Sequence, residues 1–135
     1  MSNLARLTYI GFAWLFAASI AVQVLLAGLA LFADPAHWSR HADFARYFAF
    51  LPLLMLLAAW TGRLPKELAW RSLGLFGIVI ALFLTAILSS RIGALSALHP
   101  VNALFLFWSC MAAIRRSGII RQDPAGIVTN RLGEF

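Results

Sequence analysis

The sequence predicts an all-α integral membrane protein, folded as a four-helix up-down-up-down bundle. Of its 135 residues, 62% are hydrophobic and only 12% are charged, about half the charged share of a soluble domain. Its mean hydropathy is +0.85, and its apolar residues gather in four long runs. Because a transmembrane segment must satisfy its backbone hydrogen bonds internally, each run is predicted to be a helix.

The four runs have close to the length, about 20 residues, that a helix needs to cross a bilayer. They cover residues 7–32, 44–60, 72–90 and 98–114. The first ends at the breaker Ala33-Asp34-Pro35, and the second extends back to Pro35 if its helix starts before the membrane does. Short connections make neighbouring helices antiparallel. We therefore expect a transmembrane domain over residues 1–116 and a polar cytoplasmic C-terminal tail over residues 117–135.

The distribution of Lys and Arg predicts the orientation of this multi-pass chain. Eight basic residues fall on the side of the two termini, whereas only Arg40, Arg46 and Arg91 fall on the other side. Cytoplasmic loops carry the excess of Lys and Arg, so both termini are expected in the cytoplasm. The same distribution explains the net charge of +6 by contact with a lipid bilayer, without a nucleic-acid partner.

His41 and His99 are the candidate functional residues. Each lies at the start of an apolar run, and with this topology both lie at the outer ends of helices two and four. Ionisable side chains at membrane depth are costly, which makes a matched pair a hypothesis for a functional site. Helices two and four are diagonal partners, separated by roughly 11–14 Å when neighbouring axes are 8–10 Å apart. This gap permits two imidazoles to hold one haem iron between them, although it does not require it.

Three outer-face arginines accompany the histidines. Arg40, Arg46 and Arg91 lie near His41 or His99 in sequence or topology, and haem propionates would pair well with guanidinium groups. We therefore include all three arginines in the candidate cofactor site.

Other interpretations of these polar residues remain open. His41 is alternatively an interfacial histidine bound to lipid headgroups, and His99 a helix-capping residue before Pro100. His37, one helical turn before His41, is either solvated or replaces His41 as the ligand. Gln23 lies within the first run and either holds helices together or contacts a ligand such as a quinone.

Two sequence blocks carry a resemblance. They are Val22-Gln23-Val24-Leu25-Leu26-Ala27-Gly28 and, at the start of the fourth run, Leu98-His99-Pro100-Val101-Asn102-Ala103-Leu104. Together with His41 they resemble a family of small bacterial and archaeal four-helix membrane proteins of uncharacterised function, over roughly residues 8–116. The layout is also similar to a four-helix half of haem A synthase and to membrane b-type cytochromes.

This resemblance implies a plasma (inner) membrane protein that binds one haem b, with His41 and His99 as the axial metal ligands. The sequence departs from the expected pattern at two positions. Ala45 stands where we expect a glycine against the haem face, and Thr85 stands where we expect a glutamine in helix three.

The sequence leaves two hypotheses for function and does not decide whether the protein is an enzyme. All five acidic residues lie at membrane borders or outside them, and no nucleophile with a suitably spaced base is present. The first hypothesis is a b-type cytochrome-like protein that exchanges electrons near the outer face with a quinone or a partner redox protein. The second, which the C-terminal tail motivates, is a cofactor-free accessory subunit of a larger respiratory or photosynthetic membrane complex.

Overall fold

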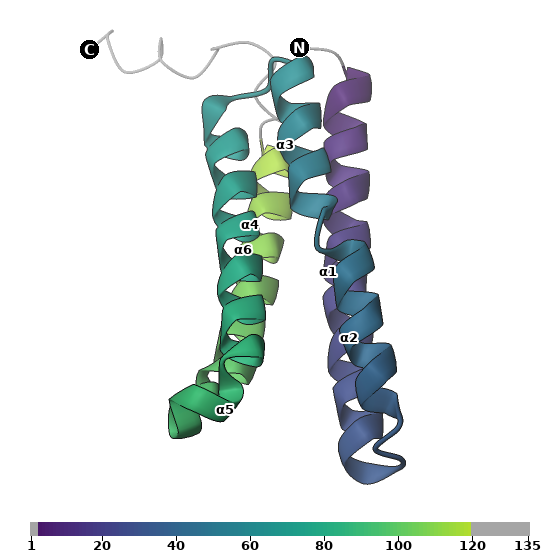
Figure 1. Ribbon diagram of the computed structural model, residues 1–135. Coiled ribbons are helices and arrows are strands. Elements are labelled where there is room, and N and C mark those ends of the chain that lie inside the picture. The colour runs from purple at the N-terminus through teal and green to yellow at the C-terminus, as the bar shows by residue number, and fades with distance from the viewer. Residues whose placement is uncertain (1–2, 120–135) are drawn as a thin grey trace, which may run out of the picture.

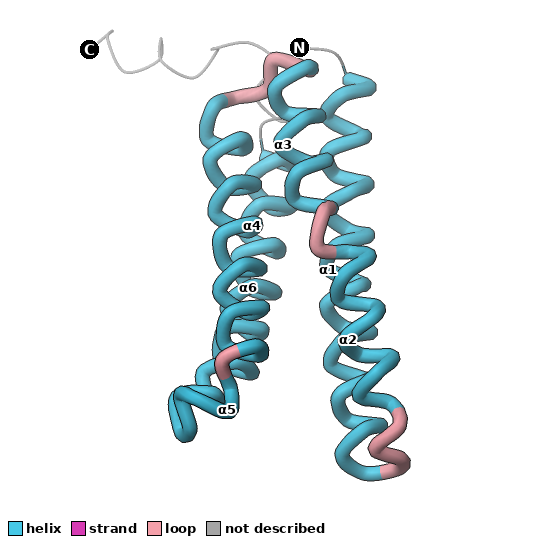
Figure 2. The backbone as a smooth tube through the Cα atoms, viewed as in Figure 1, coloured by secondary structure: helices cyan, strands magenta, loops and turns pink. Residues whose placement is uncertain are grey.

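The computed structural model describes residues 3–119, which form helices and short connections without a strand in that range. In chain order the helices are α1 Asn3–Phe32, α2 His37–Phe48, α3 Leu51–Thr61, α4 Lys66–Ile87, α5 Ser89–Ile92, the 3₁₀ helix η1 Gly93–Ala97 and α6 Leu98–Ile119 (Figure 1). Four helical segments are long and apolar enough to cross a membrane: Asn3–Phe32, His37–Thr61, Lys66–Ile87 and Ser89–Gly118. They run alternately up and down (Figure 2). The predicted all-α class with four membrane-length segments is confirmed.

The second segment is broken into α2 and α3 at Ala49 and Phe50. Pro52 lies in the first turn of α3. A proline has no backbone N–H, and its ring clashes with the carbonyl four residues earlier, so a continuous helix through this point is disfavoured. The break separates a polar helix, α2, which has no buried residue, from the apolar helix α3, in which five of eleven residues are buried.

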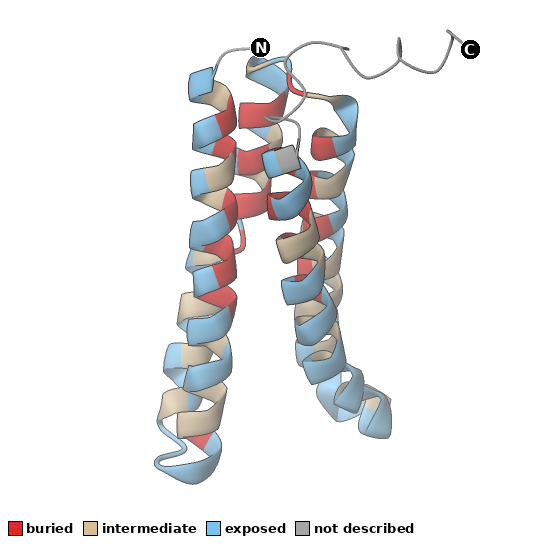
Figure 3. Cartoon of the chain, turned by 180° about the vertical axis from the view of Figure 1, so that it is seen from behind, coloured by how far each residue is buried: buried red, intermediate tan, exposed pale blue. Residues whose placement is uncertain are grey.

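Buried residues concentrate at one end of the bundle, which we name the closed end (Figure 3). It comprises the first turns of α1, the α3–α4 connection and the last turns of α6. There α3 packs between α1 and α4, and α6 closes the ring against the same two helices. The largest fully buried apolar side chains of this core are Tyr9, Phe16, Met55, Leu68, Leu75 and Leu106.

Two close contacts fix the closed end. A Cβ atom at Gly62, the residue after α3, would collide with the Cβ atom of Ala5 in α1. The buried hydroxyl of Tyr9 donates to the carbonyl of Leu68, 3.3 Å away, and lies 3.3 Å from the hydroxyl of Ser72. Buried polar groups need such partners in an apolar environment, so α1 is held to both α3 and α4.

At the opposite end, the open end, the molecule divides into two helix pairs (Figure 1). Here α2 packs on α1, and α4 packs on α6, while the two pairs diverge. The turn from α1 to α2 closes one pair, and α5 with η1 closes the other. In the α1–α2 turn, the carboxylate of Asp34 accepts the backbone N–H of Ala36 at 2.8 Å, which stabilises the turn before α2.

Helix α6 continues to Ile119, three residues beyond the predicted end of the transmembrane domain at residue 116. Ser117 is buried against the bundle. The remainder of the predicted tail, residues 120–135, lies outside the described residues, so the accessory-subunit hypothesis that it motivates stays a prediction.

Candidate functional site

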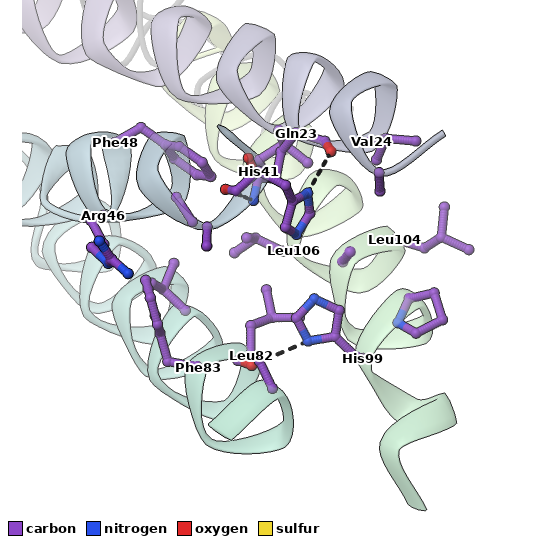
Figure 4. A pocket seen from close by; sticks show the side chains of 18 of the residues that line it. Gln23, Val24, His41, Arg46, Phe48, Leu82, Phe83, His99, Leu104 and Leu106 are labelled. Carbon is purple, nitrogen blue, oxygen red and sulfur yellow. Dashed lines mark hydrogen bonds between the residues drawn. The ribbon is translucent and has the colours of Figure 1, made fainter. Parts of the chain in front are cut away.

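A cavity of about 610 Å³ lies between the two helix pairs. Its volume is in the range of small-molecule sites, about 300–1,000 Å³. Side chains of α1, α2, α4 and α6 line it, and most of them are apolar; the polar exceptions are Gln23, His41, Arg46 and His99. Figure 4 shows these helices around the cavity. An apolar cavity with a few convergent polar groups is typical of a cofactor or ligand site.

His41 and His99 face each other across this cavity. Their ring centroids are 6.5 Å apart and their planes are inclined by 55°. His41 lies in the second turn of α2, and His99 is the second residue of α6. Because a 3₁₀ helix directly precedes α6, His99 lies within the helix rather than at its N-cap. Both rings are half-buried. The sequence-predicted pair is therefore brought together in space.

In both histidines, the Nδ1 atom is hydrogen-bonded to a backbone carbonyl. The Nδ1 atom of His41 lies 3.1 Å from the carbonyl oxygen of Gln23, and that of His99 lies 3.1 Å from the carbonyl oxygen of Leu82. A carbonyl oxygen only accepts hydrogen bonds, so each neutral ring carries its proton on Nδ1. This leaves the lone pair on Nε2, and in Figure 4 the second nitrogen of each ring points toward the other ring.

Thr85 gives His99 an additional contact. Its hydroxyl donates to the Leu82 carbonyl at 2.9 Å and lies 3.1 Å from Nδ1 of His99. In the sequence Thr85 stands out only as a departure from an expected pattern, and this contact was not predicted. A lone hydroxyl in an otherwise apolar stretch of α4 was the signal that could have indicated it.

Gln23 joins α1 to α2. Its amide nitrogen donates to the carbonyl of His41 at 2.9 Å, while its own backbone carbonyl accepts from the His41 ring. This reciprocal pair is the interhelical contact that the sequence suggested for Gln23. Its amide oxygen is buried and has no hydrogen-bond partner within residues 3–119.

The three predicted arginines occupy different places. Arg46 lines the cavity and forms an exposed ion pair with Asp43 at 2.8 Å. Arg40 donates to the Nδ1 atom of His37 at 3.3 Å, and Arg91 lies exposed in α5. Arg40, Arg91 and His37 are not among the residues that line the cavity. The structure thus brings His41, rather than His37, to His99.

The chain is an α-helical protein with four helical segments, within residues 3–119, that are long and apolar enough to cross a membrane. A cavity with two histidines lies between these helices. The chain belongs to a family of unknown function, DUF6220, whose model matches residues 23–90. The match includes Gln23, His41 and Thr85 but ends before His99. No curated protein and no solved structure matches the chain, so the expected similarity to haem A synthase and b-type cytochromes has no support from the comparisons.

Proposed function

We propose that the protein is a membrane b-type cytochrome-like protein that holds one haem b between His41 and His99 and serves in electron transfer. One observation carries this proposal: two imidazoles present Nε2 toward each other across an apolar cavity, with both Nδ1 atoms bound to carbonyls. Hydrogen bonds at Nδ1 are the usual support of metal-binding histidines, because they fix the tautomer and raise the basicity of Nε2.

The separation of the rings fits a shared metal. An imidazole centroid lies about 1.2 Å from Nε2, and a histidine–metal bond is about 2.0 Å long, so two rings on opposite sides of one metal have centroids roughly 6.4 Å apart. The observed distance is 6.5 Å. The cavity of about 610 Å³ has apolar walls suited to a flat macrocycle.

The number of donors favours haem over a bare ion. Within residues 3–119, no group of three or more His, Cys, Asp and Glu side chains could hold a metal ion. A bare zinc ion needs about four ligands, whereas a haem iron needs only axial ligands from the protein. When bound, haem supplies a one-electron redox couple. The histidines hold it, and the apolar walls exclude water.

Arg46 is the arginine placed to pair with a haem propionate, because it lines the cavity. Its side chain is 69% exposed, and that of its present partner, Asp43, is 58% exposed. An exposed ion pair of this kind is worth only about 0–1 kcal/mol, so exchanging the Asp43 carboxylate for a propionate costs little. Arg40 and Arg91 lie on the open end and are available to a partner protein instead.

The proposed orientation places both termini in the cytoplasm of a bacterial or archaeal cell, with the open end outside the plasma (inner) membrane. The closed end carries six of the nine basic residues between positions 3 and 119, in agreement with the bias of cytoplasmic segments. Helix α1 continues nine residues from Gln23 to Phe32, about 14 Å at 1.5 Å per residue. The histidines then lie within the outer half of the membrane, from which electrons pass to a quinone or a redox protein.

Absorption spectroscopy and a pyridine haemochrome assay on purified protein test this function. We expect a Soret band that shifts on reduction with dithionite, and its loss in His41→Ala and in His99→Ala. His37→Ala is the matched control, because His37 lies one turn from His41 but outside the cavity. Protein purified from haem-supplied cells without visible absorbance would refute the proposal, as would loss of haem in His37→Ala alone.

A further inference from the structure

We infer that the closed end carries a binding site for the phosphate group of an anionic phospholipid. The site consists of the basic end cluster, which we define as Arg6, Arg63, Lys66, Arg71, Arg115 and Arg116. These residues come from the start of α1, the α3–α4 connection, the start of α4 and the end of α6, which meet at the closed end (Figure 1). This site is distinct from the histidine cavity, which lies toward the open end.

The basic end cluster has far more positive charge than its own acidic residue can balance. Among residues 3–119, Glu67 is the acidic residue of this end. One of its oxygens lies 3.3 Å from a terminal nitrogen of Arg71, and the other lies 2.9 Å from Nε of Arg116. Two guanidinium groups thus share one carboxylate and retain one net positive charge. Each guanidinium has five N–H donors, and both side chains are partly exposed, so a phosphate can reach them.

Arg6 adds a cation with no acidic partner among residues 3–119. It is only 7% exposed, and it donates to the carbonyl of Ser117 near the end of α6 at the long distance of 3.4 Å. None of the ion pairs within the described part of the chain involves Arg6. Buried charges are normally paired, and the partial negative charge of a helix C-terminus compensates Arg6 only in part. A nearby anion would complete the compensation.

Two tryptophans indicate which anion reaches this end. Trp60 in the last turn of α3 and Trp70 in α4 are 77% and 70% exposed. Tryptophan is enriched at the level of lipid headgroups, where one edge of the ring is wet and the other apolar. Both tryptophans lie beside the basic end cluster in sequence, which places its cations at the depth of headgroup phosphates. The favoured ligand is therefore a lipid rather than a soluble anion.

The open end provides an internal comparison. Its three cations, Arg40, Arg46 and Arg91, are accompanied by Asp34 and Asp43 among the described residues, which leaves a net charge of +1. Within residues 3–119, the closed end has six cations and one carboxylate, which leaves +5. Selectivity for anionic lipid is therefore expected at one end only.

Native mass spectrometry of the detergent-solubilised protein tests the inference, with phosphatidylglycerol and phosphatidylcholine of identical acyl chains as probes. We expect tighter binding of phosphatidylglycerol, by about tenfold or more, since each basic residue near an anionic surface strengthens binding about fivefold. Arg116→Gln should weaken phosphatidylglycerol binding about fivefold, and Arg116→Lys should retain most of it. Arg40→Gln at the open end should leave it unchanged. In the unmodified protein the preference should fall with added salt.

Four outcomes would overturn the inference. Equal affinity for the two lipids, or equal loss in Arg40→Gln, would show that the basic end cluster does not select the phosphate group. Displacement of phosphatidylglycerol by inorganic phosphate at a similar concentration would indicate a site for a soluble anion. Tighter binding of a polyglutamate peptide than of phosphatidylglycerol would indicate an acidic protein partner.

Discussion

Gly62 offers the sharpest test of how the bundle is held together. Its backbone angles, φ −78° and ψ −2°, are accessible to any residue, so the requirement for glycine is steric rather than conformational. An added methyl group would collide with the Cβ atom of Ala5 and lie 2.8 Å from the carbonyl oxygen of Ala58. Because both neighbours belong to helices packed at the closed end, neither can move without shifting a helix.

The magnitude follows from comparison with Gly74 in α4, where an added Cβ has no atom within 4 Å. Overpacking a tight contact costs about 1–3 kcal/mol, so Gly62→Ala should lower the free energy of unfolding by that amount. Gly74→Ala should raise it by up to about 1 kcal/mol, because alanine favours the helix. Two substitutions that each add one methyl group are therefore expected to act in opposite directions.

The free energies of both variants can be measured by titration from a mild detergent into SDS, followed by circular dichroism. Ala5→Gly, combined with Gly62→Ala, should recover part of the loss, since it removes one of the two colliding methyl groups. If Gly62→Ala proved as stable as Gly74→Ala, α1 and α3 would not pack as closely as described at the closed end.

Further expectations concern the helix break, the histidine support and the core. Pro52→Ala should let α2 and α3 merge into one helix and rotate His41 away from His99. The haem absorbance per protein should then fall, while the helical circular dichroism signal should not. Unchanged haem absorbance would contradict this expectation. Thr85→Val should keep the side-chain volume but remove the hydroxyl beside His99. Loss of a hydrogen bond that supports a metal ligand lowers affinity by about tenfold, and haem titration should show that decrease. A haem affinity equal to that of the unmodified protein would assign the support to the Leu82 carbonyl alone. Cys110 is fully buried, and its thiol lies 3.3 Å from the Ala13 carbonyl. It should react with maleimide about tenfold more slowly than a thiol introduced by Leu104→Cys, at a position that is 71% exposed. Equal reaction rates would mean that the reagent reaches the core.

The sequence predicts the helices well because length and hydropathy suffice for that purpose. The first helix ends at Phe32, directly before the predicted breaker at Ala33-Asp34-Pro35. Helix starts are predicted less well. For example, α4 begins at Lys66, six residues before its apolar run, because a helix can extend past the hydrocarbon region while hydropathy reports only the part within it.

The arrangement of the helices could not be predicted from the same pattern. In a membrane-type bundle, apolar residues face both the core and the lipid, so composition does not distinguish the two faces. Leu104 and Leu106 in α6 show this, since one is 71% exposed and the other 2%. The divergence of the two helix pairs, and the cavity between them, therefore emerge only in three dimensions.

The candidate site was predictable in part. His41 and His99 stand out as ionisable residues at the edges of apolar runs, and the structure brings them together. The groups that orient them were not predictable, because two are backbone carbonyls, at Gln23 and Leu82, which every residue possesses. Only the tertiary contact decides which carbonyl meets which ring.

Helix α1 runs unbroken from the closed end past the histidine cavity, so a small tilt at one end becomes a larger displacement at the other. From Ala5, held against Gly62, to Gln23 beside His41 there are 18 residues, or about 27 Å of stiff rod at 1.5 Å per residue. Tilting α1 by about 5° about its anchored end would displace the His41 ring by roughly 2.4 Å, more than one iron–nitrogen bond length. A substitution at the closed end, tens of ångströms from the imidazoles, would therefore decide whether both rings can bind the same iron atom.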